Sequence, residues 1–392
     1  MLRPTLFLVS LGAIARVAVA DAPAPPKPVT IDDTCVDRGT CKTKALDHFA
    51  AALAAQKAGK ADRPLRIAYL GDSLTAADEI VHGLREKLGK VLGAGGPGFV
   101  HAANPHPFDQ NNAVVRWIGG GWTVHGVSTA MPADRLLGLG GSAEGSGTIR
   151  FATVAPVRSI DVHYLAQPRG GALAIVADKL TVKVDTSADT KRSEFKRVEL
   201  PEGTRRVELQ ASGVRLFGAT LEAARGVVVD NLGVVNATAK GFATNIQPDH
   251  LRNQLAHRAP DLTIVMLGTN EAEWLGARGP GMAEHEKVFG DLLATVRAAN
   301  PDSSCLVVSP LDQMDWRDPQ FQPRTSVPAM VDAQHRAATA HGCAFWNLYD
   351  WMGGKGSSLA WFRRGLLIKD FQHPTAAGAA LLADALYAGL VR

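Results

Sequence analysis

Toward both ends of the chain, apolar runs alternate with amphipathic stretches, which is the pattern of strands followed by helices. An apolar run at residues 65–70 precedes residues 75–92, where apolar side chains recur at helical spacing. The alternation resumes near residue 227. The whole pattern predicts further strands at 227–231, 262–267, 304–309 and 344–348, and helices at 47–58, 282–299, 327–340 and 375–390. Strands that alternate with helices indicate a parallel, doubly wound α/β sheet of the flavodoxin-like kind.

The middle of the chain has a different pattern, because long helical periodicity is missing between residues 100 and 248. Short runs bounded by Gly, Pro and Asp appear instead, and several alternate apolar with polar side chains. They predict strands at 147–152, 160–164, 172–177, 181–185, 195–200, 205–211 and 214–222. This pattern is typical of an antiparallel all-β unit, such as a sandwich or jelly roll. We therefore expect one α/β domain that is interrupted by an inserted β domain.

The predicted boundaries divide the chain into five parts. They are a signal peptide at 1–20, a Pro-rich linker with a small cysteine loop at 21–42, the first part of the α/β domain at 43–100, the inserted β domain at 101–226, and the second part of the α/β domain at 227–392. A chain of 392 residues with 46% hydrophobic side chains can fill two such cores. The formal net charge is only +4, without a run of like charges, so nucleic-acid binding is not indicated.

The first residues of the chain have the pattern of an export signal. Arg3 gives a positive start, residues 5–15 are apolar, and Ala-Val-Ala at residues 18–20 forms a cleavage site before Asp21. The alternative is an uncleaved membrane anchor, but the apolar stretch is too short to span a bilayer, and no later segment is long enough. We therefore expect cleavage, export to the periplasm or the cell exterior, and no stable membrane span.

The chain has four cysteines, which fall into two pairs. Cys35 and Cys41 enclose a short loop, and in an exported chain they are predicted to form a disulfide. Cys305 and Cys343 each lie in an apolar run, so two buried thiols are the favoured interpretation, with a disulfide across neighbouring strands as the alternative. A metal site on these cysteines is not indicated, because the spacings typical of zinc ligands do not accompany them.

A serine follows the first predicted strand, where the chain turns into a helix. Ser73 lies in the sequence Gly-Asp-Ser-Leu at residues 71–74. This position lies above the carboxyl ends of the strands, where open α/β sheets bind ligands. A hydroxyl there can act as a nucleophile when a base and oxyanion donors are close to it. The alternative role for Ser73 is that of a helix N-cap.

A base and an acid that can orient it occur near the C-terminus. His373 follows Asp370 by three residues. One loop can therefore carry both, with the carboxylate accepting from Nδ1–H and Nε2 left free to take a serine proton. The alternative is a capping or surface pair.

An asparagine follows another predicted strand. Asn270 lies in the sequence Gly-Thr-Asn-Glu at residues 268–271, directly after the strand at 262–267. Its amide can donate to an oxyanion, although turn chemistry is the commoner role of such an asparagine. Because the carboxyl ends of parallel strands meet at one rim, we expect Asn270, Ser73 and His373 to lie there together.

The order of these motifs resembles that of the SGNH/GDSL hydrolase superfamily. Gly-Asp-Ser-Leu, Gly-Thr-Asn-Glu and Asp-x-x-His follow one another as they do in that superfamily, and the resemblance covers roughly residues 64–100 and 227–392. It implies a serine esterase that needs no metal or organic cofactor. Ser73, Asp370 and His373 would form its catalytic triad.

The resemblance also implies an oxyanion hole. Its donors would be the backbone N–H of Ser73, the side-chain amide of Asn270, and a backbone N–H in the turn at residues 229–237. Superfamily members generally have glycine where this chain has Ala237, whose N–H can still donate. Gly233 is the alternative donor.

Further segments make the resemblance narrower. Residues 344–348, residues 352–357 and Trp361 are similar to the exported branch related to peptidoglycan O-acetylesterases. Members of that branch carry an inserted β-sandwich similar to carbohydrate-binding modules, at the position of the β domain predicted here. The resemblance implies that the protein removes O-linked acetyl groups from a glycan such as a cell-wall polysaccharide.

Several tryptophans are candidate sugar contacts, because aromatic faces stack on sugar rings. Trp346 and Trp361 are candidates for the sugar site, with core packing favoured for Trp346 because it lies on a predicted strand. Trp117 and Trp122 are either a carbohydrate platform or part of the β core. Other histidines, His163 among them, show no partner pattern and are assigned no role.

Alternative functions share the same residues. A glycan O-acetyltransferase would use the same triad, with a sugar hydroxyl in place of water, and acetyl transfer to an added acceptor would distinguish it. A non-enzymatic glycan-binding protein on an esterase scaffold is disfavoured by the intact Ser73, Asn270, Asp370 and His373. A general GDSL lipase or esterase is disfavoured because the sequence has no long apolar lid segment.

Overall fold

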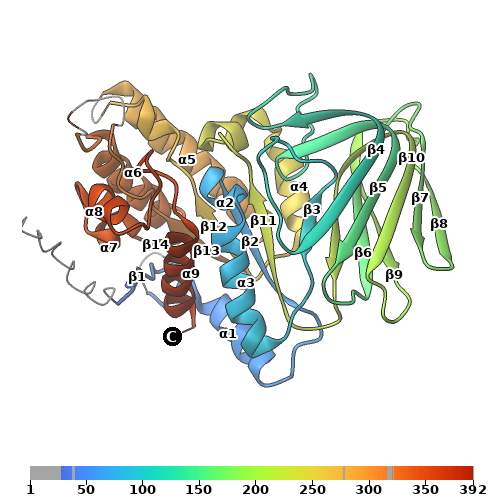
Figure 1. Ribbon diagram of the computed structural model, residues 1–392, viewed down its shortest axis with the longest axis horizontal. Helices are drawn as coiled ribbons and strands as arrows, with labels where there is room; N and C mark the ends of the chain where they lie inside the picture. Colours follow the sequence, from blue (N-terminus) through green and yellow to red (C-terminus); the bar gives the residue numbers. More distant parts are fainter. Residues whose placement is uncertain (1–27, 38–39, 277–278, 316–319, 321, 392) are drawn as a thin grey trace, which may run out of the picture.

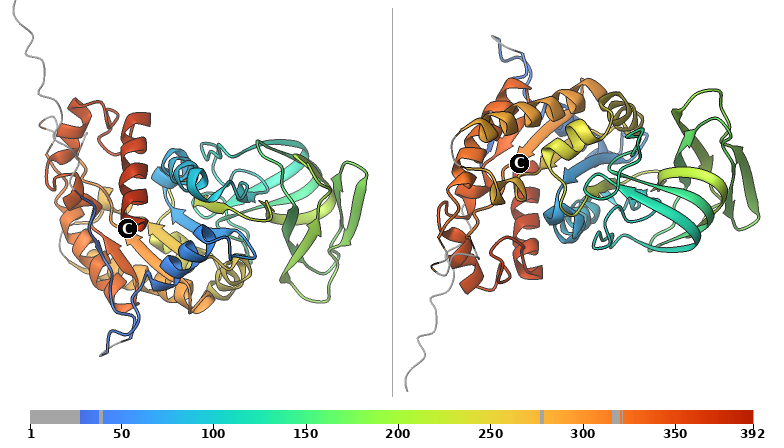
Figure 2. Two further views of the ribbon diagram at one scale, coloured as in Figure 1. Left: turned by 90° about the horizontal axis from the view of Figure 1, so that it is seen from below. Right: turned by 90° about the horizontal axis from the view of Figure 1, so that it is seen from above.

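The computed structural model describes residues 28–37, 40–276, 279–315, 320 and 322–391 (Figure 1). The predicted signal peptide at residues 1–20 lies outside these residues. The described chain forms two β-sheets that lie side by side, one flanked by helices and one made of antiparallel strands (Figures 1 and 2).

The element bounds follow the chain order. The helices are α1 (Asp47–Lys57), α2 (Ser73–Ala76), α3 (Glu79–Leu92), η1 (Gly241–Asn245), α4 (Pro248–Arg258), η2 (Glu271–Glu273), α5 (Pro280–Ala299), α6 (Ser326–Ala340), α7 (Leu348–Met352), α8 (Ser357–Arg363) and α9 (Ala376–Leu390). The strands are β1 (Ile31–Asp32), β2 (Leu65–Gly71), β3 (Gly98–His101), β4 (Val114–Gly126), β5 (Gly141–Thr153), β6 (Ser159–Ala166), β7 (Ala172–Ala177), β8 (Leu180–Asp185), β9 (Arg192–Glu199), β10 (Arg206–Glu222), β11 (Val227–Gly233), β12 (Leu262–Met266), β13 (Ser304–Val308) and β14 (Ala344–Trp346).

The first sheet confirms the predicted α/β architecture. Within the described residues its strand order is β1-β14-β13-β12-β2-β11, and all neighbours are parallel except β1, which runs antiparallel to β14. The parallel strands have the flavodoxin-like order, in which the chain direction switches between β2 and β12. Ligands bind outside the carboxyl ends of the strands at such a switch point.

Helices cover both faces of this sheet, so its strands are buried on both sides (Figures 1 and 2). Along β2, Ile67 and Tyr69 pack toward α1, α3 and α9, while Ala68 and Leu70 pack toward α4, α5 and α6. This alternation follows from the two-residue period of a strand. Among the described residues, no helix combines the length and the apolarity needed to cross a membrane.

The predicted helix at 75–92 is divided into α2 and α3. Asp78 separates the two helices with a left-handed backbone conformation, φ 64°. Its fully buried carboxylate accepts hydrogen bonds from Asn231 Nδ2 at 3.0 Å and from Arg85 Nη2 at 3.5 Å. Helical spacing in the sequence carries no sign of these distant partners, so the break was not predicted.

The second sheet is antiparallel and is built around β10. The first half of β10 pairs with β5 and β7, and its second half pairs with β3 and β6, so one strand runs through both arms of the sheet (Figure 1). The strands predicted at 205–211 and 214–222 are in fact this single strand, whose register shifts between Ala211 and Val214. β4 was not predicted, because Gly119–Gly121 interrupt its apolar alternation.

A cluster of buried charges joins the two sheets. Arg258, at the end of α4, donates to Asp230 of β11 at 2.6 Å and pairs with Glu222 of β10 at 2.7 Å. Arg66 of β2 holds the other side of Glu222 with two hydrogen bonds of 2.9 and 2.7 Å. The side chains of Arg258, Glu222 and Asp230 are each at most 3% exposed, so each charge depends on its partners instead of water.

The ionisation of this cluster follows from its pairing. Burial opposes the charge on Glu222, but Arg258 and Arg66 outweigh burial and lower the pKa of Glu222 to about 2. Burial also opposes the charge on Arg258, but Asp230 and Glu222 raise the pKa of its guanidinium. Glu222 and Arg258 are therefore both charged at neutral pH.

A glycine is required at the start of β3, where the chain enters the antiparallel sheet and passes beside this cluster. Gly98 begins β3 with a φ of 75°, and a Cβ at this position would lie 2.2 Å from Asp230 Oδ1. The next residue, Phe99, donates its N–H to the same oxygen at 2.8 Å.

Two disulfides are present. Cys35 pairs with Cys41, as predicted, with Cα atoms 5.0 Å apart. Cys305 pairs with Cys343 across β13 and the start of β14, with Cα atoms 4.6 Å apart. The favoured interpretation of two buried thiols was therefore wrong, and the alternative disulfide is the one found.

We expect Arg258→Ala to lower the free energy of unfolding by about 3–5 kcal/mol, because it leaves two buried carboxylates without their partner. Urea unfolding at neutral pH measures this change. The matched control is Arg252→Ala on the same helix, which removes an exposed pair with Asp249 and should cost less than about 1 kcal/mol. An equal decrease in the free energy of unfolding in the two variants would contradict a stabilising role of the buried cluster.

Candidate active site

Ser73 is the first residue of α2, directly after β2. Asp72 is the N-cap of this helix, and its side chain accepts a hydrogen bond from the N–H of Leu74 at 3.1 Å. The alternative role of Ser73 as the N-cap is therefore wrong. Its hydroxyl is left free for another partner.

That partner is His373, which lies 300 residues away in the sequence. Ser73 Oγ and His373 Nε2 are 2.7 Å apart, within hydrogen-bond reach. Ser73 lies beyond the carboxyl end of β2, and His373 lies in the loop that precedes α9. The fold thus brings together two of the residues that the motifs singled out.

Asp370 is the third member of this arrangement. Its Oδ2 accepts from His373 Nδ1 at 2.8 Å, while its Oδ1 accepts from the backbone N–H groups of Gln372 and His373 at 2.9 and 3.0 Å. Phe371, between them, has a left-handed backbone with φ 59°. The Asp-x-x-His spacing therefore makes a tight turn in which one carboxylate holds both the backbone and the ring.

Charges in this group favour a base oriented by an anion. Burial acts to raise the pKa of Asp370, but hydrogen bonds from His373 and Gln372 outweigh it and hold that pKa below its usual value. The hydrogen bond from Asp370 raises the pKa of His373, although burial opposes this change. The side chains of His373 and Asp370 are 37% and 33% exposed, so the site is open to solvent.

Asn270 follows β12, as predicted, at the start of η2. Its Nδ2 donates to the carbonyl oxygen of Ala237 at 2.8 Å. The N–H of Ala237 is already donated to Val234 O at 3.0 Å, and the N–H of Gly233 to Asn231 Oδ1 at 3.0 Å. Neither backbone donor expected from the sequence is therefore free, which corrects the assignment to Ala237 and also disfavours Gly233.

Asn236 is the residue of this turn that the sequence did not single out. It is exposed, its φ is 63°, and its N–H has no hydrogen-bond partner among the described residues. A left-handed backbone is usual for glycine and tolerated by asparagine. Asn236 therefore takes the conformation expected of a glycine in this turn, one residue before Ala237.

Gln372 is a second residue that motif spacing did not reveal. It is 4% exposed, and its Nε2 donates to Glu273 Oε1 at 2.9 Å. This bond ties the loop of His373 to the segment that carries Asn270. Two motifs far apart in the sequence are thus fixed to one another at the rim of the sheet.

The candidate sugar contacts divide into buried and exposed tryptophans. Trp346 is 2% exposed, in agreement with a core role, and Trp361 is 4% exposed with its indole N–H donated to Met352 O. Trp361 is therefore not an open sugar contact. Trp117 is 54% exposed on β4, whereas Trp122 packs against the core of the antiparallel sheet.

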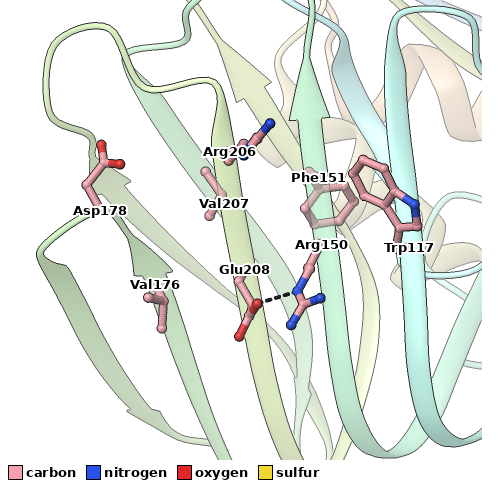
Figure 3. A pocket seen from close by; sticks show the side chains of 8 residues that line it. All are labelled: Trp117, Arg150, Phe151, Val176, Asp178, Arg206, Val207 and Glu208. Carbon is pink, nitrogen blue, oxygen red and sulfur yellow. Dashed lines mark hydrogen bonds and ion pairs between the residues drawn. The ribbon is translucent and has the colours of Figure 1, made fainter.

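Trp117 lines a hollow of about 530 Å³ on the antiparallel sheet (Figure 3). The other polar lining residues are Arg150, Asp178, Arg206 and Glu208, and Arg150 pairs with Glu208 at 2.5 Å. A second hollow, of about 420 Å³, shares Trp117 and Arg150 with the first. The indole of Trp117 therefore borders both hollows.

Comparison with known families agrees with the motifs. The sequence model of the GDSL-like lipase/acylhydrolase family matches residues 202–381. This range contains Asn270, Asp370 and His373, while Ser73 precedes it. Among curated proteins, a stretch of 84 residues is 34% identical to part of a 4-coumarate–CoA ligase from Halorhodospira halophila, covering 20% of this chain and 22% of that protein. The chain thus spans about a fifth of that relative, whose activity is not transferred.

Comparison with solved structures identifies the fold. A peptidoglycan O-acetylesterase structure matches with a TM-score of 0.74 and 22% identity, over 87% of this chain and 94% of that one. The shared fold includes both sheets, since it spans most of each chain. Residues 202–381 thus match the GDSL-like lipase/acylhydrolase family, and the fold of the chain is that of the peptidoglycan O-acetylesterase structure.

Proposed function

We propose that the protein is an exported serine esterase that removes O-linked acetyl groups from a glycan. The proposal rests on a continuous series of hydrogen bonds. Ser73 Oγ lies 2.7 Å from His373 Nε2, and His373 Nδ1 lies 2.8 Å from Asp370 Oδ2. A serine, a base and an orienting acid in this arrangement are the parts of a catalytic triad.

The proposed reaction begins with proton transfer to the histidine. His373 Nε2 takes the proton of Ser73 as Oγ attacks the ester carbonyl, while Asp370 holds Nδ1–H and stabilises the imidazolium. The same nitrogen then returns its proton to the leaving sugar oxygen. Water, activated by His373, hydrolyses the acyl-enzyme and regenerates the serine.

The oxyanion of the tetrahedral intermediate needs donors that are not already engaged. We assign them to the N–H of Ser73 at the start of α2, to the N–H of Asn236, and to the second N–H of the Asn270 amide, whose other N–H is donated to Ala237 O. Asn236 replaces Ala237 in this role because the N–H of Ala237 is donated to Val234. The start of a helix adds a favourable field for a developing negative charge.

The substrate class rests on the fold and on the openness of the site. The similarity to a peptidoglycan O-acetylesterase over nearly the whole of both chains supports an acetylated cell-wall glycan. Side chains of His373 and Asp370 that are about one-third exposed suit an ester on a bulky polymer better than a ligand enclosed in a cavity.

Export is supported by two features of different kinds. Residues 1–20 have the pattern of a signal peptide, and the chain contains two disulfides, which persist in oxidising compartments. We therefore assign the mature protein to the periplasm or the cell exterior, where cell-wall glycan is found.

The antiparallel part, residues 101–226 in the predicted division, is proposed to be an inserted sandwich-like domain that contacts glycan. The exposed indole of Trp117 stands between two hollows lined by charged and polar side chains, which suits stacking and hydrogen bonding to sugar rings. A glycan O-acetyltransferase would use the same residues, and transfer of acetyl to an added glycan acceptor in preference to water would favour it.

We expect Ser73→Ala to lower kcat/KM on p-nitrophenyl acetate by about 10³-fold or more, because the nucleophile is lost. Initial rates on the acetate, butyrate and octanoate esters measure both the loss and the acyl preference, with acetate preferred. The control is Ser212→Ala, which removes an exposed hydroxyl at the irregularity in β10. Full activity of Ser73→Ala would exclude the proposed triad, and a preference for octanoate would exclude an acetylesterase.

We expect kcat/KM on the acetyl ester to rise with pH through a midpoint above 6.5, because only neutral His373 accepts the serine proton and Asp370 raises its pKa. The charges of Asp72 and Glu273 act in the same direction. Asp370→Asn should move the midpoint to lower pH and reduce kcat/KM by about 10⁴-fold. A pH-rate profile of each protein gives the result.

The control for this profile is Asp249→Asn, whose carboxylate is 87% exposed on α4 and far along the chain from the histidine loop. Its midpoint should equal that of the wild type. A wild-type midpoint below 6.5, or one that Asp370→Asn leaves in place, would contradict the assigned pairing.

We expect Trp117→Ala to weaken binding to polymeric acetylated glycan by about 3- to 10-fold, the loss of one stacking contact, without changing kcat/KM on p-nitrophenyl acetate. Pull-down with insoluble glycan and the chromogenic assay measure the two quantities. Val154→Ala, at an exposed apolar position directly after β5, is the control. Unchanged glycan binding by Trp117→Ala would show that the hollows are not a glycan site.

A further inference from the structure

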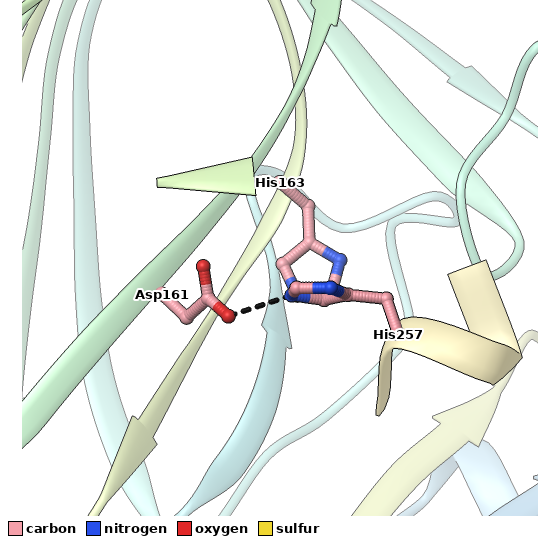
Figure 4. Close-up of side chains that lie close together, drawn as sticks. All are labelled: Asp161, His163 and His257. Atoms are coloured by element: carbon pink, nitrogen blue, oxygen red, sulfur yellow. Dashed lines mark hydrogen bonds and ion pairs between the residues drawn. The ribbon is translucent and has the colours of Figure 1, made fainter. Parts of the chain in front are cut away.

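We propose that Asp161, His163 and His257 form a zinc-binding site where β6 meets α4 (Figure 4). This site is independent of the proposed esterase function, because it uses a different set of side chains. His163 thereby gains a role, although its sequence context shows no partner pattern.

The fold brings three candidate ligands together from two separate elements. Asp161 and His163 are two residues apart on β6, so their side chains share one face of the strand. His257 lies in the last turn of α4. One ligand atom from each residue lies within 4.8 Å of the other two. Figure 4 shows the carboxylate and the two imidazoles converging from strand and helix.

His163 is held in the form that binds metal. Its Nδ1 lies 2.9 Å from Gln254 Oε1, and Gln254 Nε2 donates to Ser193 Oγ at 3.1 Å, which fixes the orientation of the amide. Since an amide oxygen only accepts, the proton of the imidazole is on Nδ1. A metal-binding histidine is held in the same way, with its other ring nitrogen donating to an oxygen.

The other ring nitrogen of His163, Nε2, takes no part in a hydrogen bond among the described residues. His163 is 0% exposed, and its Nε2 is buried with no hydrogen-bond partner among the described residues. Asp161 is 8% exposed, and its Oδ1 is likewise buried without a partner there. Two buried acceptors that face one small region without a donor are the arrangement that a cation satisfies.

His257 is positioned by an aromatic neighbour and gives access from solvent. The ring of His257 stacks on Phe195, with ring centroids 3.5 Å apart and an interplanar angle of 7°. Phe195 also makes an edge contact with His163, with ring centroids 4.9 Å apart. His257 Nε2 lies 2.7 Å from Asp161 Oδ2, and its side chain is 32% exposed. An ion can therefore enter from the side of His257.

Two imidazoles and a carboxylate are a ligand set that zinc uses, with water in the fourth position. A simple ion pair between His257 and Asp161 is the alternative. The chain has such a pair elsewhere, since His335 Nε2 lies 2.8 Å from Asp32 Oδ2, but that pair is not joined by a third ligand within the described residues. Asp161, His163 and His257 therefore differ from an ordinary histidine–aspartate contact, because a third candidate ligand lies beside the pair.

The test is zinc binding by the full mature chain, prepared without a histidine tag and stripped with a chelator. Isothermal titration with Zn²⁺ measures stoichiometry and affinity, and the absorption spectrum with Co²⁺ in place of Zn²⁺ reports nitrogen and oxygen ligands. We expect one ion per chain at this site. His257→Ala, which changes an exposed residue and preserves the fold, should weaken it by more than about tenfold.

His335→Ala is the matched control and should leave zinc affinity unchanged. Bound zinc should also raise the melting temperature of the wild type and of His335→Ala, but not that of His257→Ala, because an ion that binds only the folded state stabilises it. Absence of zinc binding by the wild type, or the same affinity in His257→Ala, would overturn the proposal.

Discussion

The guanidinium of Arg258 is a charge that the fold has removed from water, and the junction of the two sheets depends on it. Its partners, Glu222 at the end of β10 and Asp230 in β11, lie on either side of the point where the chain re-enters the α/β sheet. Losing either carboxylate would leave a buried charge, so the geometry of this crossing has little freedom. Since Asn236 follows β11 by only three residues, the same constraint positions one side of the candidate active site.

The candidate active site combines local turns with long-range contacts. Asp370 organises its own loop through bonds to Gln372 and His373, so the orientation of both side chains is set by a few neighbouring residues. Ser73 reaches His373 only because β2 and the loop before α9 end at the same rim, 300 residues apart. A local turn therefore supplies orientation, while the doubly wound sheet supplies proximity.

The α/β part was largely predictable, because the periods of helices and strands can be read from consecutive residues. The motif order singled out Ser73, Asp370 and His373, which the fold brings together. What escaped prediction depended on contacts distant in sequence. The division of α2 from α3 arises from the buried Asp78, and β10 is continuous because β5 pairs with it on both sides of its irregularity. The N–H of Ala237, which was expected to be an oxyanion donor, is donated to Val234 O, and such hydrogen-bond occupancy of a turn is invisible in its sequence.

The disulfide between Cys305 and Cys343 has a consequence for how the protein is made. Both cysteines are 0% exposed, on the face of the sheet that α5 and α6 cover. An oxidant cannot reach the sulfurs once those helices are in place. The bond must therefore be made while the chain is still open, and an electron acceptor must reach the two thiols before folding is complete.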